Sequence, residues 1–120
     1  MCTQSQLNEI LQKVYLRSKE IFGNSFDSVI LFGSYARGDF DEESDIDILI
    51  LADIPSAKLS DYREHIDALC GDLFWEYGIV ISAIEKDTET YNRYSNILPF
   101  YKNIAKEGVK IALRRFNKPF

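Results

Sequence analysis

Two aspartates, Asp45 and Asp47, stand at the start of an apolar run that continues from Ile48 to Leu51. The length and β-branched content of this run predict a buried strand. Because side chains alternate between the two faces of a strand, both carboxylates point the same way. Neighbouring carboxylates repel, and burying either one without a partner is unfavourable by several kcal/mol. A divalent cation offsets this repulsion best, and Mg²⁺ favours one or two carboxylates together with substrate phosphates.

The segment before the aspartates carries groups that suit a phosphate. Residues 26–32 are predicted as a strand, which ends at Gly33 and Ser34. Gly33 allows a sharp turn or a close approach of a ligand, and Ser34 is a good N-cap for a short helical turn through Arg37, closed by Gly38. Backbone N–H groups at a helix start bind anions, and a serine hydroxyl adds one donor. A phosphate-binding turn beside two metal-binding carboxylates is suited to phosphoryl or nucleotidyl transfer.

These residues resemble the signature of a known superfamily. Gly33-Ser34, ten intervening residues and then Asp45-Ile46-Asp47 are similar to the motif of the DNA polymerase β-like nucleotidyltransferases. The fuller string, from Gly33 to Gly38 and from Ser44 to Leu49, resembles the minimal nucleotidyltransferase (MNT) branch. Proteins of this branch are commonly encoded beside a HEPN-domain protein as a toxin–antitoxin pair. The resemblance implies transfer of a nucleoside monophosphate, dependent on Mg²⁺ or Mn²⁺, from ATP or another nucleoside triphosphate to a hydroxyl.

The resemblance also assigns roles to the motif residues. Gly33 and Ser34 would hold the β- and γ-phosphates, and Asp45 and Asp47 would hold the metal and act as catalytic residues. Arg37 would either help to neutralise the triphosphate or fix the acidic loop that follows it.

A third catalytic carboxylate is implied on the strand beside the two aspartates. The predicted third strand, residues 76–85, has Ser82 as the polar residue of its buried run, and its acids stand at the ends as Glu76, Glu85 and, just beyond, Asp87. Glu85 is the candidate, provided that the register turns it inward. Without a third carboxylate one Mg²⁺–nucleotide still binds, but two-metal activation of a nucleophile is disfavoured.

The remaining periodicities predict the elements that position this motif. Apolar residues at helical spacing indicate three helices, over residues 5–22, 55–74 and 100–107, the first of which ends at Gly23. A further helix carries Tyr91 and Tyr94 and is capped by Asp87 or Thr88, and a last edge strand is predicted over 109–113. A helix between two strands indicates a crossover. We therefore expect one domain, residues 1–120, of α/β (α+β) class: a small mixed sheet flanked by helices, with the palm-like nucleotidyltransferase fold.

Net charge, cysteine spacing and the lengths of the apolar runs limit the classes of partner and the compartment that we expect for this protein. A net charge of −5 disfavours nucleic-acid binding as the main function. Cys2, expected in a frayed terminus, and Cys70 show no metal or redox spacing, and no apolar run has membrane-spanning length, so we expect a cytoplasmic protein outside the membrane. His65 is expected at the surface. The basic C-terminal third, with Lys102, Lys106, Lys110 and residues 114–120, is either a partner-docking surface, an RNA contact or a solvated face. Homo-oligomerisation stays open.

Three functions share this motif. The leading hypothesis is an Mg²⁺-dependent transferase that moves AMP from ATP to a tyrosine of a HEPN partner and so acts as an antitoxin. The alternative is an antitoxin that neutralises a HEPN ribonuclease by binding alone, and the absent central acid on the third strand favours it. A Mg²⁺–nucleotide sensor is the third.

Overall fold

The computed structural model describes residues 2–112, and its centre is a four-stranded mixed sheet. The strands are β1 (Phe26–Phe32), β2 (Ile46–Ala52), β3 (Ile81–Asp87) and β4 (Val109–Lys110), in the order β3-β2-β1-β4. β1 is antiparallel to both β2 and β4, whereas β2 and β3 are parallel. The parallel pair requires a crossover, which the helical segment between these strands supplies. The expected α/β class with a mixed sheet is confirmed.

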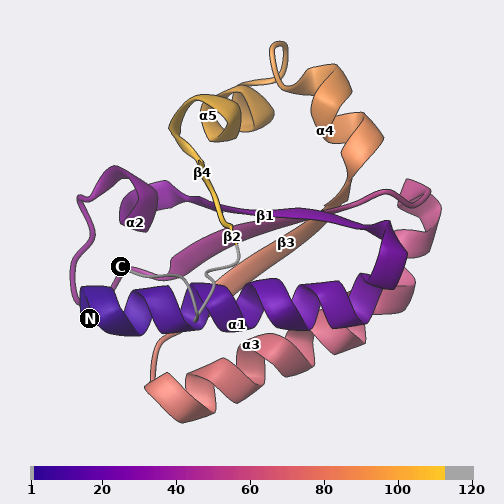
Figure 1. The fold of residues 1–120 in the computed structure, drawn as a ribbon. Coiled ribbons are helices and arrows are strands. Elements are labelled where there is room, and N and C mark those ends of the chain that lie inside the picture. The colour runs from indigo at the N-terminus through magenta and orange to yellow at the C-terminus, as the bar shows by residue number, and fades with distance from the viewer. Residues whose placement is uncertain (1, 113–120) are drawn as a thin grey trace, which may run out of the picture.

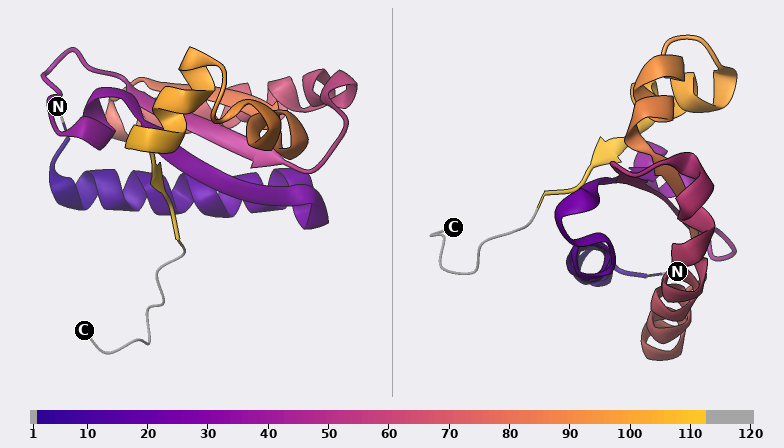
Figure 2. Two further views of the ribbon diagram at one scale, coloured as in Figure 1. Left: turned by 90° about the horizontal axis from the view of Figure 1, so that it is seen from above. Right: turned by 90° about the vertical axis from the view of Figure 1, so that its right-hand side faces the viewer.

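Two helices cover one face of the sheet (Figures 1 and 2). α1 (Gln4–Phe22) begins at a capping box formed by Thr3 and Gln6, and it ends at Gly23, whose φ of 57° and ψ of −130° together suit only glycine. α3 (Arg63–Tyr77) lies beside it. Alternate residues of the strands meet both helices in the main hydrophobic core, which includes Leu7, Ile10, Val14, Val29, Leu31, Ile46, Ile48, Ile50, Ile66, Leu69, Leu73, Ile81 and Ala83.

The opposite face is covered by α4 (Thr88–Tyr94) and α5 (Pro99–Glu107), which lie on the other side of the sheet in Figure 2. A smaller core lies there, where Ile104 of α5 packs on Ile30, Leu49 and Leu51. Pro99 opens α5 at a position where its missing N–H is not needed, and Gly108 ends the helix. Both short helices therefore stand over the face on which alternation places Asp47.

The Gly-Ser turn forms α2 (Gly33–Arg37), a helix of five residues. Its N-cap is Phe32, which makes no side-chain cap hydrogen bond. The prediction that Ser34 is the N-cap is therefore wrong, because Ser34 already lies inside the helix. Gly38 closes the helix with φ 87°, as expected. The acidic loop then folds back, with the ring of Phe40 stacked on Tyr35 at 4.2 Å and 8°.

Several element boundaries differ from the sequence prediction. The segment after Pro55 begins as a 3₁₀ helix, η2 (Ser56–Tyr62), and becomes α-helical only in α3. α3 continues through Glu76 to Tyr77 and ends at Gly78 with φ 70°, so the third strand starts at Ile81 and not at Glu76. A second short 3₁₀ turn, η1 (Gly23–Ser25), joins α1 to β1. β4 spans two residues, and the last residue of the predicted edge strand lies outside the described residues.

The N-terminal segment is also ordered differently from the prediction. Cys2 is not frayed: its side chain is buried in the main core, with Sγ 3.8 Å from the hydroxyl of Tyr35. This contact ties the start of the chain to α2, the helix of the Gly-Ser turn. Along residues 2–112, no helix combines the length and the apolar character needed to cross a membrane.

Candidate active site

The carboxylate of Asp47 lies against the backbone of Gly33. Asp47 is paired with Phe32 across the β1–β2 ladder, and Gly33 is the next residue, where the chain leaves β1 for α2. Gly33 has φ 72°, and a Cβ placed on it would collide with Oδ2 of Asp47 and lie 3.1 Å from its Cγ. Glycine is therefore required here both for its backbone conformation and for the space that the carboxylate occupies.

Asp45 and Asp47 form a pair of like charges at the start of β2. Asp47 follows Ile46, which is fully buried in the main core, so Asp47 lies on the opposite face of β2. Asp45 is exposed and immediately precedes the strand, close enough for its charge to act on Asp47. Burial raises the pKa of Asp47, the charge of Asp45 raises it further, and Arg37 lowers it. No hydrogen bond or ion pair to either carboxylate is found from residues 2–112.

This arrangement fits a divalent cation. A half-buried carboxylate with a raised pKa and a second one beside it would be relieved by a positive ion, and both supply the oxygen ligands that Mg²⁺ prefers. Among the described residues no cluster of three His, Cys, Asp or Glu side chains is placed to hold a metal. The two aspartates would therefore leave most of the coordination positions to water and substrate.

Ser34 and Arg37 stand on α2 beside this pair. The half-buried hydroxyl of Ser34 makes no hydrogen bond to another described residue. Arg37 forms ion pairs with Asp39 at 3.2 Å and with Glu107 at 3.5 Å, and its charge acts on Asp47. Both roles that the sequence left open for Arg37 are thus compatible with its position: it fixes the acidic loop and contributes positive charge at the site.

Glu85 is not brought to the carboxylate pair, and the prediction that it turns inward is wrong. The parallel ladder pairs Asp47 with Ser82 and Glu85 with Ile50. Because Glu85 is an odd number of residues from Ser82, its side chain lies on the opposite face, the face covered by α3. There it accepts a hydrogen bond of 2.7 Å from Nη1 of Arg63, and its side chain is only 14% exposed.

The two other acids near β3 are engaged elsewhere. Glu76 lies on α3 and pairs with Lys13 at 2.6 Å. Asp87 is the buried N-cap of α4, where it accepts hydrogen bonds from the backbone N–H and the hydroxyl of Thr90 at 2.9 and 2.7 Å. The residue that β3 places beside Asp47 is Ser82, which is exposed. The third strand therefore contributes a hydroxyl and no carboxylate to this site.

Sequence reasoning missed the contribution of α5. Phe100, Asn103 and Glu107 follow the spacing of one helix face, and the structure turns this face toward α2, where it lines a pocket of about 200 Å³ with Gly33 and Arg37. The i, i+3, i+7 pattern predicts a shared face, but it does not predict which element that face meets.

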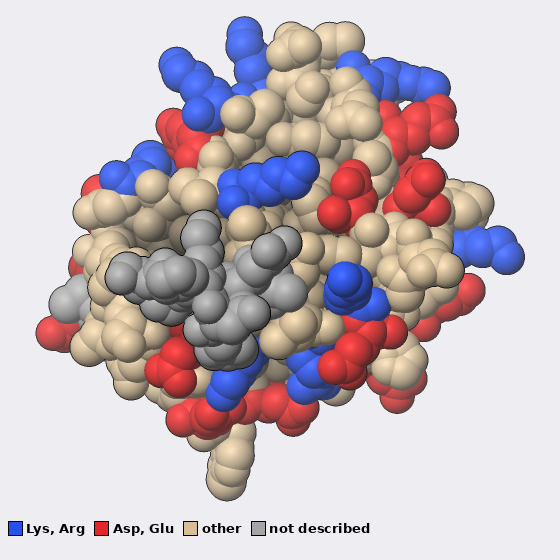
Figure 3. All heavy atoms as spheres, viewed as in Figure 1, with Lys and Arg blue, Asp and Glu red and all other residues tan. Residues whose placement is uncertain are grey.

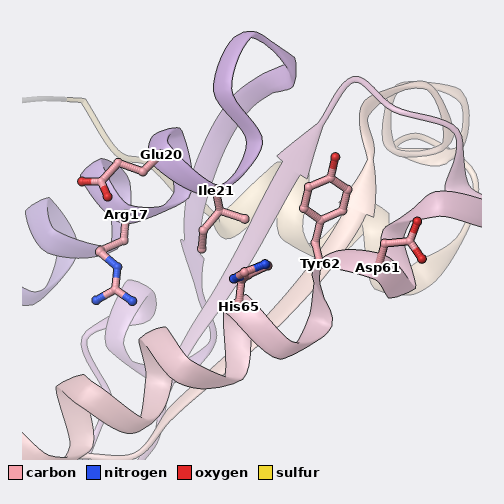
Figure 4. A pocket seen from close by; sticks show the side chains of 6 residues that line it. All are labelled: Arg17, Glu20, Ile21, Asp61, Tyr62 and His65. Carbon is pink, nitrogen blue, oxygen red and sulfur yellow. The ribbon is translucent and has the colours of Figure 1, made fainter.

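A separate pocket lies between α1 and the start of α3 (Figure 4). It contains His65, the exposed histidine, together with Glu20, Asp61 and Tyr62. Arg17, also on its wall, forms an ion pair with Asp72 at 3.2 Å. Because α1 and α3 cover the face away from Asp47, this pocket does not belong to the carboxylate site.

Comparisons with known proteins identify the family of this chain. The model of the nucleotidyltransferase domain family matches residues 11–113. The chain belongs to this family. A relative of this nucleotidyltransferase in Methanocaldococcus jannaschii, named "Putative protein adenylyltransferase", is 49% identical over 80 residues, which cover 67% of this chain and 72% of the relative. A "Protein adenylyltransferase MntA" from Thermococcus cleftensis is 37% identical over 73 residues, or 59% of this chain and 72% of that protein.

Solved structures share the fold of the nucleotidyltransferase. The crystal structure of a "putative nucleotidyltransferase" from Sulfolobus solfataricus has a TM-score of 0.55 at 23% identity, and the match covers 89% of this chain and 82% of the Sulfolobus chain. A second crystal structure, of a toxin-antitoxin with AMP-PNP, has a TM-score of 0.51 at 18% identity, and the match covers 83% of this chain and 70% of the other chain. At these identities the likeness establishes the fold.

Proposed function

We propose that this nucleotidyltransferase transfers AMP from ATP to a hydroxyl of a protein partner. The observation that carries the proposal is the carboxylate of Asp47, which lies against the Gly33 backbone with a raised pKa, beside Asp45 and without a partner among residues 2–112. Such a pair is unfavourable in the free protein and favourable once a metal–triphosphate is bound. Mg²⁺, or Mn²⁺ in its place, is the ion we assign to Asp45 and Asp47.

The residues around the pair have distinct tasks in this proposal. When bound, the ion supplies charge neutralisation and Lewis-acid polarisation at the phosphates. Gly33 lets the backbone approach the triphosphate, and the hydroxyl and N–H of Ser34 donate hydrogen bonds to its oxygens. Arg37 adds positive charge on the same side and holds the acidic loop through Asp39. Positioning and electrostatic stabilisation account for most of the rate in this class of reaction.

The acceptor we propose is a tyrosine of a HEPN-domain toxin, so that the protein acts as an antitoxin. The names of the relatives, protein adenylyltransferases, support a protein acceptor, and the likeness to a toxin-antitoxin protein supports the pairing. A nucleic-acid acceptor is disfavoured by the net charge of −5. Across the described part of the face in Figure 3, Lys and Arg alternate with Asp and Glu and form no continuous basic surface.

A second function is favoured by one observation. Since β3 places Ser82 beside Asp47 and turns Glu85 to the other face, the site has two carboxylates instead of three. A site with two carboxylates binds a metal–nucleotide but activates an acceptor hydroxyl less well. The corresponding proposal is an antitoxin that neutralises its toxin by binding alone, and a nucleotide sensor would share the same site.

A label-transfer assay separates these functions. The purified protein, Mg²⁺ and ATP labelled at the α-phosphate are incubated with the protein encoded by the neighbouring gene, with Asp45→Asn/Asp47→Asn as the inactive variant. Asp61→Asn, an acidic residue on the other face of the sheet, is the matched control. We expect label on the partner with the wild-type protein and with Asp61→Asn, and none with the double variant. A stable complex that forms without any label transfer would overturn catalysis and favour binding alone.

A further inference from the structure

The pocket between α2 and α5 opens beside the carboxylate site. Its α5 wall is one helical face, with Phe100, Asn103, Ile104 and Glu107 at positions i, i+3, i+4 and i+7. Gly33 lies in the opposite wall, with Asp47 against its other side. The pocket and the carboxylate of Asp47 therefore both adjoin Gly33.

An aromatic surface is available in this pocket. The ring of Phe100 meets Phe32 edge-on, with centroids 5.9 Å apart and planes at 87°, and Phe100 is 43% exposed. Phe32 stands opposite Asp47 in the β1–β2 ladder. A partly exposed aromatic ring offers its π-face to a flat partner, and stacking there adds to the gain from burying the ring. Nucleobases are such partners, because every base has a π-face that stacks on aromatic side chains.

A hydrogen-bonding group stands on the same helix face. Asn103 is exposed, lies almost one helical turn after Phe100, and its side-chain amide makes no hydrogen bond to the described residues. An amide presents a donor and an acceptor side by side. Adenine presents the complement, an amino group beside a ring nitrogen, and asparagine is a common bidentate partner of that edge.

The walls of this pocket are tied together. Glu107, near the end of α5, forms an ion pair of 3.5 Å with Arg37 of α2. Tyr101, the neighbour of Phe100, is buried and packs edge-on against Tyr91 of α4, so the first turn of α5 contacts α4 through Tyr101 and β1 through Phe100. A pocket with fixed walls suits a rigid planar ligand, because binding then costs little further ordering of side chains.

We propose that this pocket is the nucleobase subsite of the nucleotide site, in which Phe100 stacks on the base and Asn103 selects adenine. The inference rests on the proposed function, since it places the triphosphate at Gly33, Ser34 and the carboxylates. In this arrangement the nucleotide lies along Gly33, so that its phosphates are at the carboxylates and its base is against α5. Asn103 is then a specificity-determining residue that does not touch the reacting atoms.

Equilibrium binding measured by calorimetry with Mg²⁺ tests this assignment. The probes are ATP, GTP and inorganic tripolyphosphate, which carries the phosphates without a base. We expect Phe100→Ala to weaken the binding of ATP and of GTP by about ten-fold or more, which is the usual effect of losing one stacked aromatic side chain. Asn103→Leu is expected to abolish the preference for ATP over GTP. Neither variant should change tripolyphosphate binding, because the phosphate site is untouched.

Controls keep the assignment distinct from the proposed function. Phe74→Ala removes a phenylalanine of similar exposure, 50%, from α3 on the other face and should leave all three ligands unaffected. Thermal melting of each variant shows whether it is folded. If the wild-type protein binds both nucleotides and tripolyphosphate, and the two α5 variants bind all three ligands as it does, the base subsite is wrong and the phosphate site stands. If the wild-type protein binds none of the three, the proposed function fails and the subsite with it.

Discussion

The α-carbon of Gly33 lies so close to the carboxylate of Asp47 that no side chain fits between the phosphate-binding turn and the aspartate strand. The contact joins the end of β1 to the start of β2, whose ladder pairs Phe32 with Asp47. It fixes the distance between the two halves of the motif, the turn and the carboxylates. The spacing seen in the sequence thereby becomes a single site in space.

Replacement of Gly33 by alanine should disrupt both stability and ligand binding. The φ of 72° disfavours alanine, and its Cβ would collide with Oδ2 of Asp47, which together we expect to lower the free energy of unfolding by about 2 kcal/mol. Chemical denaturation measures this change. Gly71→Ala is the matched control: a Cβ there meets no atom within 4 Å, and alanine in a helix interior should stabilise by about 0.5–1 kcal/mol. Equal stability of Gly33→Ala and the wild-type protein would contradict the contact.

Asp47→Asn should stabilise the metal-free protein at neutral pH. Because burial and the charge of Asp45 raise the pKa of Asp47 in the folded state, its ionised form opposes folding. Stability conferred by its protonation is present below the unfolded pKa and is lost as the pH rises through the folded pKa. The variant should therefore melt above the wild-type protein at pH 7, with the difference vanishing at acidic pH.

A divalent metal should reverse the order of melting temperatures of the wild-type protein and Asp47→Asn. Mg²⁺ or Mn²⁺ stabilises whichever protein binds it in the folded state, so the melting temperature of the wild-type protein should rise with metal and that of Asp47→Asn should not. Asp61→Asn, on the opposite face, serves as the control and should respond to metal as the wild-type protein does. A metal response that is the same in Asp47→Asn would refute the assignment of Asp47 as a ligand.

Ser82→Asp should strengthen the metal site. The β2–β3 register places residue 82 beside Asp47, so an aspartate there adds a third carboxylate on the same face. We expect Mn²⁺ to bind about ten-fold tighter, because added ligand charge raises affinity for hard cations. The metal-free variant should be less stable than the wild-type protein, since three carboxylates would repel. Mn²⁺ titration calorimetry and melting curves measure the two effects.

Glu85→Gln serves as the control for Ser82→Asp, because it changes a carboxylate of the same strand on the other face of the sheet. Glu85 pairs with Arg63 at 2.7 Å on the far face, so its replacement should lower stability by about 1 kcal/mol and leave metal and nucleotide binding unchanged. Loss of metal binding in Glu85→Gln would mean that the glutamate leaves Arg63 and reaches the aspartates, which would contradict the register.

Acid should weaken the attachment of α4 through Asp87. Burial on its own would raise the pKa of Asp87, but the hydrogen bonds from Thr90 outweigh it and lower the pKa below its usual value. The stability from this cap is therefore present above the unfolded pKa and is lost as the pH falls through the folded pKa. Asp87→Ala should lower the free energy of unfolding by about 1 kcal/mol at pH 7 and less at low pH. A pH-independent difference between the two proteins would contradict this cap.

The features that the sequence determined by itself are local ones. The boundaries of β1, the lengths of α1 and α5 within one residue, and the glycines that end α1 and α2 follow from periodicity and backbone preference, which act over a few neighbours. The placement of Asp47 on the face opposite Ile46 and Ile48 is of the same kind, since neighbouring residues of one strand lie on opposite faces.

Only the tertiary structure decided what stands beside those aspartates. Whether residue 82 or residue 85 adjoins Asp47 depends on the register between β2 and β3, and a shift of one residue turns every side chain to the other face. The register is set by the packing of Ile81 and Ala83 against the core under α3, far from the motif in sequence. The placement of Phe100 and Asn103 opposite Gly33 likewise depends on how α5 docks on Ile30 and Leu49, because a helix face acquires its neighbours only when the sheet is assembled.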